Sequence, residues 1–147
     1  MKRLLPVLSL IILAQPAFAQ TVTDSDFVLT INEGSSNEVV ESTTLIPLLE
    51  GACYEWRLKL TKTKDAVDIT EVFTLPSAPS GWGTPGDNVT ISEDMKTATS
   101  TLSLVPEGGW IGHGWCVAEG DPAGGHTIVV KSGDKVLGEF PFVVEAM

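Results

Sequence analysis

Apolar and polar residues alternate with a period of two along most of this chain. The clearest run follows Gly51. Its apolar face holds Tyr54, Trp56, Leu58 and Leu60, and its polar face holds Glu55, Arg57, Lys59 and Thr61. A period of two is that of a β-strand, and a polar second face is typical of an antiparallel sheet with one side in water. The pattern therefore predicts a strand with Trp56 in the core.

Similar runs recur along the chain, separated by segments rich in Gly, Pro, Asn and Asp. We expect strands near residues 27–31, 39–46, 51–61, 67–75, 89–91, 97–105, 110–118, 126–131 and 136–144. Seven to nine short strands with regular turn signals indicate a β-sandwich or barrel. Residues 132–134 predict a tight hairpin before the last run, whose apolar face is predicted to hold Val136, Phe140, Phe142 and Val144.

Acidic side chains interrupt two of these runs. Glu55 and Glu71 stand in otherwise apolar or aromatic strands. We interpret them as outward-facing or ion-paired strand residues, because a glycosidase would need two carboxylates placed across a cleft and nothing in the sequence pairs these two.

Two glycine-rich segments carry aromatic residues that the strand pattern does not assign to the core. Trp82 lies in the middle of the long loop 77–87, and the segment 108–114 holds Trp110 and His113. Exposed tryptophans are common in sugar-binding and protein-binding surfaces. The sequence therefore gives Trp82, Trp110 and His113 as a candidate binding surface; the alternative is that the indoles cap the ends of the sandwich and His113 is a structural residue.

Cys53 and Cys116 are the two cysteines of the chain. In an exported protein they predict one disulfide, which closes a loop of about 64 residues and stabilises the fold by about 4 kcal/mol in the chain-entropy estimate. Cys53 shares its strand phase with Glu55, and Cys116 shares its phase with Trp110. Either a bulge resets the phase, or the disulfide lies outside the core or at an end of the sandwich.

The first 19 residues have the pattern of a cleaved signal peptide. Lys2 and Arg3 precede an apolar run at 4–13, and Ala17-Phe18-Ala19 is a cleavage site. The run is too short to span a bilayer, and no cysteine follows it as a lipid attachment point. We expect a single domain at residues 20–147, without a stable membrane anchor, in the periplasm or outside the cell.

Charge narrows the choice of partners. The net charge is −10, and without Lys2 and Arg3 seven basic residues stand against 19 acidic ones, a net charge of −12. Such a surface repels nucleic acid and anionic lipid, so we expect no nucleic-acid partner. It favours solubility, or a basic partner or a cation.

No motif indicates catalysis or a cofactor. The chain has no G-x-S-x-G motif, and His113 and His126, its two histidines, lack the spacing of a zinc site. The acidic loops lack the pattern of a calcium loop. We therefore expect no catalytic residues, no metal, no cofactor and no enzymatic activity.

Three stretches resemble known domains. Residues 44–47, with Gly51 and the aromatic strand after it, resemble the first half of a family of small secreted bacterial domains of unknown function. Residues 120–126 and 138–144 are similar to the last two strands of bacterial immunoglobulin-like domains. There an early aromatic residue often hydrogen-bonds back across the turn, and His126 stands where tyrosine is commoner. The resemblance implies an immunoglobulin-like antiparallel β-sandwich, and no activity.

These observations lead to a non-enzymatic binding or accessory domain of the bacterial envelope. Its expected partner is another envelope protein or a glycan, bound through the loop 77–87 and the segment 108–114. One alternative is an inhibitor or modulator of an envelope hydrolase, which a protruding rigid loop with a well-exposed carboxylate or His113 would favour. The other is a carbohydrate-binding module, which a flat aromatic platform would favour. An enzyme would need a cleft where His113 or Glu55 meets another titratable group.

Overall fold

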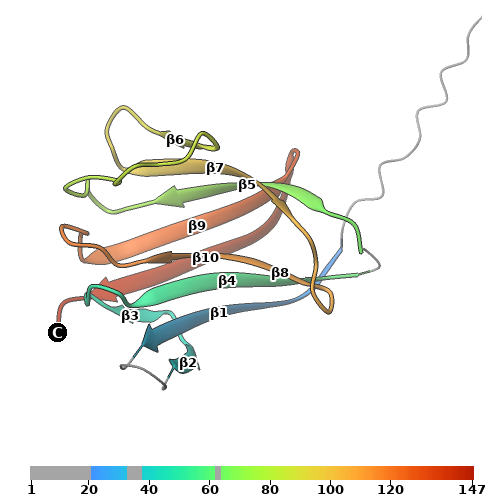
Figure 1. Ribbon diagram of the computed structural model, residues 1–147, viewed down its shortest axis with the longest axis horizontal. Helices are drawn as coiled ribbons and strands as arrows, with labels where there is room; N and C mark the ends of the chain where they lie inside the picture. The colour runs from blue at the N-terminus through green and yellow to red at the C-terminus, as the bar shows by residue number, and fades with distance from the viewer. Residues whose placement is uncertain (1–20, 33–37, 62–63) are drawn as a thin grey trace, which may run out of the picture.

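Two β-sheets make up the part of the chain that the computed structural model describes, residues 21–32, 38–61 and 64–147 (Figure 1). The smaller sheet has the order β2-β1-β4-β8, with β1 at Val22–Asn32, β2 at Glu38–Ser42, β4 at Cys53–Leu60 and β8 at Trp110–Cys116. The larger sheet has the order β3-β10-β9-β5-β7-β6, with β3 at Leu45–Pro47, β5 at Val67–Thr74, β6 at Val89–Ile91, β7 at Thr97–Leu104, β9 at Gly124–Ser132 and β10 at Lys135–Glu145.

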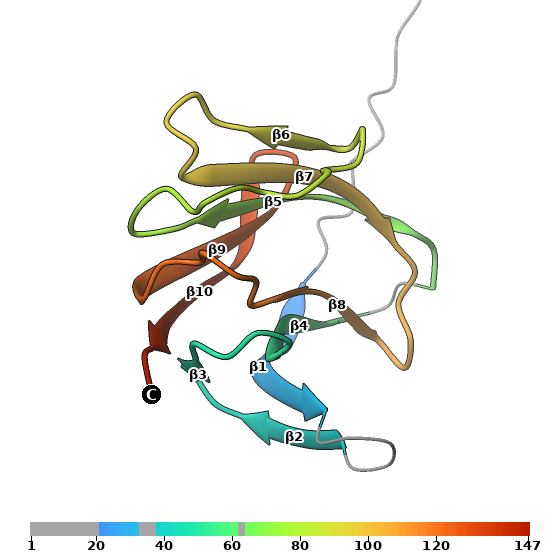
Figure 2. The ribbon, with the colours of Figure 1, turned by 60° about the vertical axis from the view of Figure 1, so that its left-hand side comes forward.

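The predicted all-β sandwich is confirmed. The two sheets form separate layers (Figure 2), and no described segment is a helix long and apolar enough to cross a membrane. The predicted signal peptide, residues 1–19, lies outside the described residues.

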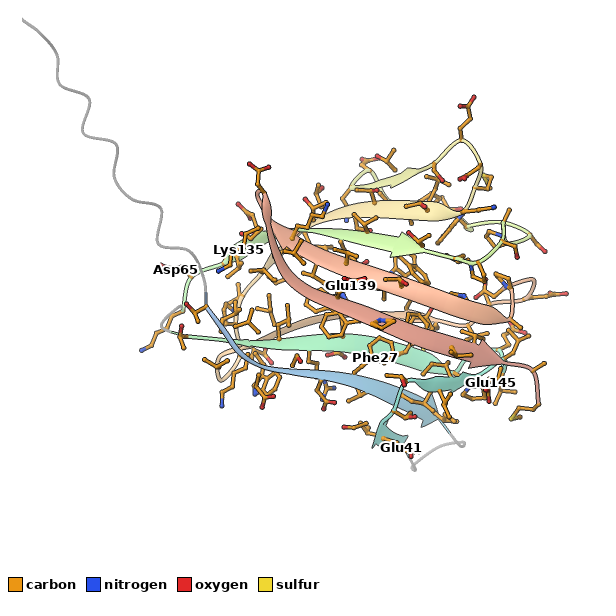
Figure 3. All side chains as sticks on the ribbon, turned by 180° about the vertical axis from the view of Figure 1, so that it is seen from behind. Phe27, Glu41, Asp65, Lys135, Glu139 and Glu145 are labelled. Atoms are coloured by element: carbon orange, nitrogen blue, oxygen red, sulfur yellow. A yellow bond between two sulfur atoms is a disulfide. The ribbon has the colours of Figure 1, made fainter. Side chains whose placement is uncertain are left out.

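Side chains fill the space between the sheets (Figure 3). Phe27 of β1 joins the layers, because its ring stacks on Phe140 and Phe142 of β10 at centroid distances of 6.2 and 4.8 Å. Trp56 of β4 is fully buried, as its strand phase predicted. The inward residues of β4 are those of the predicted apolar face, so the period-two pattern places this strand correctly.

The described residues form ten strands, one more than the expected maximum of nine. The run at 39–46, expected as a single strand, divides into β2, which pairs with β1, and β3, which pairs with β10. The chain thus passes from the edge of one sheet to the edge of the other, and a strand pattern in sequence cannot show that crossing. The pairing of β3 with β10 is parallel, whereas the other described pairs are antiparallel.

The last strand departs from its predicted phase near its start. The hairpin at 132–134 forms as predicted, with Gly133 at φ +56°. A register shift between Val136 and Gly138 then turns Leu137 inward, and Val136, predicted inward, is 52% exposed. A bulge reverses the side-chain phase of a strand, which explains the error.

The disulfide Cys53–Cys116 forms, and it lies on the outer face of the smaller sheet. The two cysteines are directly opposite each other in the β4–β8 pair, with Cα atoms 3.9 Å apart. Their neighbours Tyr54 and Trp115 turn inward. No bulge interrupts this pair, so the strand phases were right and the disulfide is outside the core.

Candidate functional site

A pocket of about 350 Å³ opens where the larger sheet extends past the smaller one. β4 and β8 face β5, as the hydrogen bonds below show, whereas β7 and β6 continue the larger sheet beyond that point. Residues of β6, β7, β8 and the preceding loop line the pocket: Trp82, Thr84, Pro85, Gly86, Asn88, Val89, Ile91, Ser100, His113, Gly114 and Trp115. We call it the Trp82–His113 pocket.

Glu71 lies behind this pocket and is completely buried. Its carboxylate faces three ring N–H groups of the opposite sheet. Trp56 donates from Nε1 to Oε2 over 2.5 Å, Trp115 donates from Nε1 to Oε1 over 2.8 Å, and Nδ1 of His113 lies 2.8 Å from Oε2. An ionised carboxylate only accepts hydrogen bonds, so it suits three donors, and a buried carboxylate requires such partners. The cluster ties β5 to β4 and β8.

His113 connects this buried cluster to the pocket. It lies in β8 next to the wall of the pocket, with about a third of its side chain exposed. Nδ1 donates to Glu71, so the neutral form of the ring has its lone pair on Nε2. Among the described residues Nε2 has no hydrogen-bond partner. In its neutral form His113 therefore offers the pocket an acceptor, and the hydrogen bond to Glu71 fixes the orientation of the ring.

Ser100 forms part of the floor of the pocket. It pairs with Glu71 in the β5–β7 ladder and is 1% exposed. Its Oγ has no hydrogen-bond partner in the described part of the chain. A buried hydroxyl without a partner is uncommon in folded proteins and is unfavourable for stability. The hydroxyl is consequently available to a polar group that enters the pocket.

Two indoles form the aromatic wall. Trp82 donates from Nε1 to the carbonyl of Met95 over 2.8 Å, which holds the long loop against the β6–β7 turn. Its ring meets Trp115 at a centroid distance of 5.9 Å and an interplanar angle of 73°, and it meets Phe73 edge-on. The indoles thus form a corner. The flat platform that would favour a module binding extended glycan chains is not what these two residues make.

Binding is chemically better supported here than catalysis. His113 does meet a second titratable group at a cleft, the arrangement set out above as a requirement for an enzyme. However, the Ser100 hydroxyl makes no hydrogen bond to His113. A nucleophile needs contact with its base. His113 also lies within β8 and not on a protruding loop, so it does not provide the feature that would favour an inhibitor.

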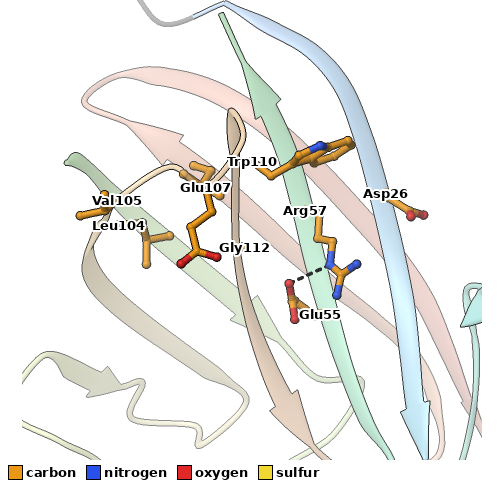
Figure 4. Close-up of a pocket in the computed structure, with 9 residues that line it drawn as sticks. Asp26, Glu55, Arg57, Leu104, Val105, Glu107, Trp110 and Gly112 are labelled. Carbon is orange, nitrogen blue, oxygen red and sulfur yellow. Dashed lines mark hydrogen bonds and ion pairs between the residues drawn. The ribbon is translucent and has the colours of Figure 1, made fainter. Parts of the chain in front are cut away.

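Trp110, the third residue of the candidate surface, lies elsewhere. It has the outward phase of β8, opposite to His113, and the Lys59 ammonium stands 5.8 Å from its ring centroid. It lines a separate pocket of about 460 Å³ near the Glu55–Arg57 ion pair (Figure 4). The structure therefore brings Trp82 and His113 together and separates Trp110 from them. The binding role of all three residues stays a prediction.

The two acidic strand residues, Glu55 and Glu71, face opposite sides of their sheets: one faces solvent and the other faces the core. Glu55 faces outward and pairs with Arg57 at 2.8 Å, as expected. Glu71 faces the core instead, where His113 and the two indoles are its partners. The position was visible in the sequence, because Glu71 stands on the apolar face of the run 67–75. The sequence could not show which N–H donors surround Glu71, because those donors come from the other sheet.

Ser100 and Trp115 are the other site residues that sequence reasoning missed. Ser100 shares the strand face of Ala98 and Leu102, so its polar side chain on an apolar face was a usable signal. Trp115 stands beside Cys116 in the sequence, but its indole turns inward to Glu71 while the cysteine turns outward.

His126 makes a local hydrogen bond to the backbone two residues before it. Its Nδ1 lies 2.9 Å from the carbonyl oxygen of Gly124, an acceptor, so Nδ1 carries the hydrogen. The ring is buried and stacks on Phe142 at 5.2 Å. Burial lowers the pKa of His126 below its ordinary value, partly offset by the bond to Gly124 and by Asp121.

Comparison with known proteins agrees with this fold. A family model described as PM0630 beta sandwich domain matches residues 25–145. The crystal structure of an immunoglobulin-like protein from Pseudomonas aeruginosa superposes with a TM-score of 0.62 over 86% of this chain and 97% of that one, at 18% sequence identity. At that identity the likeness concerns the fold alone. No curated protein matches the chain in sequence.

Proposed function

The chain belongs to the PM0630 beta sandwich domain family, and from that premise we propose that it is an exported, non-enzymatic binding or accessory domain of the bacterial envelope. Its partner, another envelope protein or a glycan, binds in the Trp82–His113 pocket. This proposal uses two of the three residues that the sequence singled out and replaces Trp110 with Trp115 and Ser100.

One observation carries the proposal: the pocket combines supported aromatic walls with polar groups that are left unpaired. His113 is oriented by Glu71, Trp82 is held by the Met95 carbonyl, and Ser100 has a buried hydroxyl without a partner among the described residues. Recesses with mostly apolar walls and a few oriented polar groups are the usual form of small-ligand sites.

Export is supported by the leader pattern of residues 1–19 and by the disulfide, a bond typical of non-cytoplasmic compartments. The absence of catalysis is proposed because no hydroxyl or thiol of the described residues hydrogen-bonds to His113, so this base has no nucleophile to activate. The mass of the chain recovered from the periplasm or medium tests the export step, and it should correspond to a chain that begins at Gln20.

The binding role can be tested with two variants that each replace one tryptophan by alanine, one inside the pocket and one outside it. The immobilised mature protein, Trp82→Ala and Trp110→Ala are each incubated with envelope extract, and retained proteins and glycans are identified by mass spectrometry. We expect Trp82→Ala to lose a component that wild type and Trp110→Ala both retain, because Trp82 lines the pocket and Trp110 does not. Equal retention by all three proteins would exclude the pocket as the binding site.

A further inference from the structure

We propose that the ligand of the Trp82–His113 pocket is a neutral, hydroxyl-rich ring, namely a pyranose unit of an envelope glycan. This inference rests on the proposed function and narrows it from any envelope partner to one ligand class. Four properties of the pocket support it: its lack of charged lining groups, its acceptors, its unpaired hydroxyl and its indole corner.

The first property is electrical neutrality. None of the described residues that line the pocket is Lys, Arg, Asp or Glu. The carboxylate behind it, Glu71, is fully buried and already faces three ring N–H groups. A charged ligand would lose water here without gaining an ion pair, which is strongly unfavourable. The pocket therefore selects for an uncharged molecule.

The second property is an excess of hydrogen-bond acceptors. In the neutral imidazole, Nε2 of His113 is an acceptor, because Nδ1 donates to Glu71. The Asn88 amide donates from Nδ2 to the carbonyl of Thr101, which leaves its Oδ1 as an acceptor at the rim. A matching ligand has to donate several hydrogen bonds from different edges, as the hydroxyls of a sugar ring do.

The third property is the hydroxyl of Ser100. It can both donate and accept, and nothing in the described structure uses either capacity. A hydroxyl partner satisfies both roles through small rotations, whereas an aliphatic group satisfies neither. Ser100 is thus the most discriminating group of the floor.

The fourth property is the shape of the aromatic wall. Trp82 and Trp115 meet at 73°, and both Nε1 atoms are turned away to other partners. The indoles therefore offer π-faces and edges to the ligand. A pyranose has one apolar C–H face and a polar rim, so it can pack against an indole while its hydroxyls reach His113 and Ser100. The volume of about 350 Å³ lies within the range of small-ligand sites.

The test is an NMR titration of the ¹⁵N-labelled mature protein. The four indole N–H signals report on Trp56, Trp82, Trp110 and Trp115 separately. The probes are the methyl glycosides of glucose, galactose and N-acetylglucosamine, with glucuronic acid and glucosamine as charged counterparts of the same size. We expect at least one neutral glycoside to shift the Trp82 and Trp115 signals saturably, leave Trp110 unmoved, and bind at least about tenfold more tightly than the charged sugars.

Ser100→Ala separates a binding role from a structural one. Its hydroxyl makes no internal hydrogen bond, so its removal should leave the unfolding midpoint unchanged or raise it, while it weakens glycoside binding severalfold. Trp82→Ala should abolish binding, and Trp110→Ala should keep it. If no neutral glycoside shifts the two indole signals, or charged sugars bind equally well, the ligand class is wrong. A protein still captured through Trp82 would then leave the proposed function standing, whereas no capture through Trp82 would remove both.

Discussion

Glu71 shows how one residue can organise the contact between two sheets. Three ring nitrogens of β4 and β8 hydrogen-bond to the single carboxylate of Glu71 in β5. Taking a carboxylate out of water is unfavourable by several kcal/mol unless such bonds replace its hydration. Once formed, the bonds fix which residues of the two sheets face each other, including His113 at the pocket.

The contribution of this cluster can be measured with Glu71→Gln. The amide keeps the size of the side chain but presents N–H groups to indole and imidazole donors, so some buried donors lose their acceptor. We expect the unfolding free energy to fall by about 2–4 kcal/mol in urea denaturation followed by tryptophan fluorescence. Glu55→Gln is the matched control, because its ion pair is partly exposed, and it should change stability by less than about 1 kcal/mol. Similar losses in both variants would contradict a special role for Glu71.

His126 gives the protein a predictable response to pH. Its pKa is lowered on folding, chiefly by burial, from an ordinary value of 6.5. The folded state therefore binds fewer protons than the unfolded state below that pH, and stability decreases as the pH falls from about 7 through 6.5 toward the lowered value. Unfolding free energies measured across this range should show the decrease, and His126→Phe should reduce its slope. A slope that survives the substitution would place the effect on other groups.

At the scale of elements, inward and outward residues alternate along β8 and have different roles. Its inward residues, Ile111, His113 and Trp115, serve the core and the pocket. Its outward glycines allow close approach to β4: a Cβ on Gly114 would lie 2.6 Å from the carbonyl oxygen of Tyr54, and one on Gly112 would lie 2.8 Å from that of Trp56. These distances are too short for any side chain, which explains why this strand is so rich in glycine.

The disulfide belongs to the same strand pair and can be removed without opening the core. Because both cysteines face outward, Cys53→Ser with Cys116→Ser should leave the near-ultraviolet circular dichroism unchanged and lower the unfolding free energy by about 2–4 kcal/mol. Denaturant titration of the double variant against the oxidised wild type measures the difference. Loss of the aromatic signal in native buffer would mean instead that the bond is needed to order β4 and β8.

At the scale of the whole molecule, the pocket results from the unequal widths of the two sheets. Six strands face four in the described residues, so part of the larger sheet at β7 and β6 lacks a facing strand. The long loop carrying Trp82 covers part of that surface, and the pocket is the space that remains. Its lining is uncharged although the chain carries a net charge of −10, which sets it apart from the general surface.

The sequence by itself determined the strands and most of their faces. Period-two alternation predicts which residues turn inward, because side chains of a strand point to opposite sides in turn. The same rule placed Trp56 in the core, gave both cysteines the outward strand phase, and put Glu71 on an otherwise apolar face. It failed where a bulge reversed the phase near Val136 and where one run divided between two sheets.

Only the tertiary structure decided which strands face each other, and the site depends on that. Trp82 and His113 are distant in sequence, and they line the same pocket because the loop 77–87 and strand β8 lie on its two sides. Trp110 is only three residues from His113, but it lies on the opposite face of β8. The donors that surround Glu71 come from another sheet, and alternation within one strand carries no information about the other layer. A local pattern fixes the face of a residue, whereas its partners follow from packing of the whole chain.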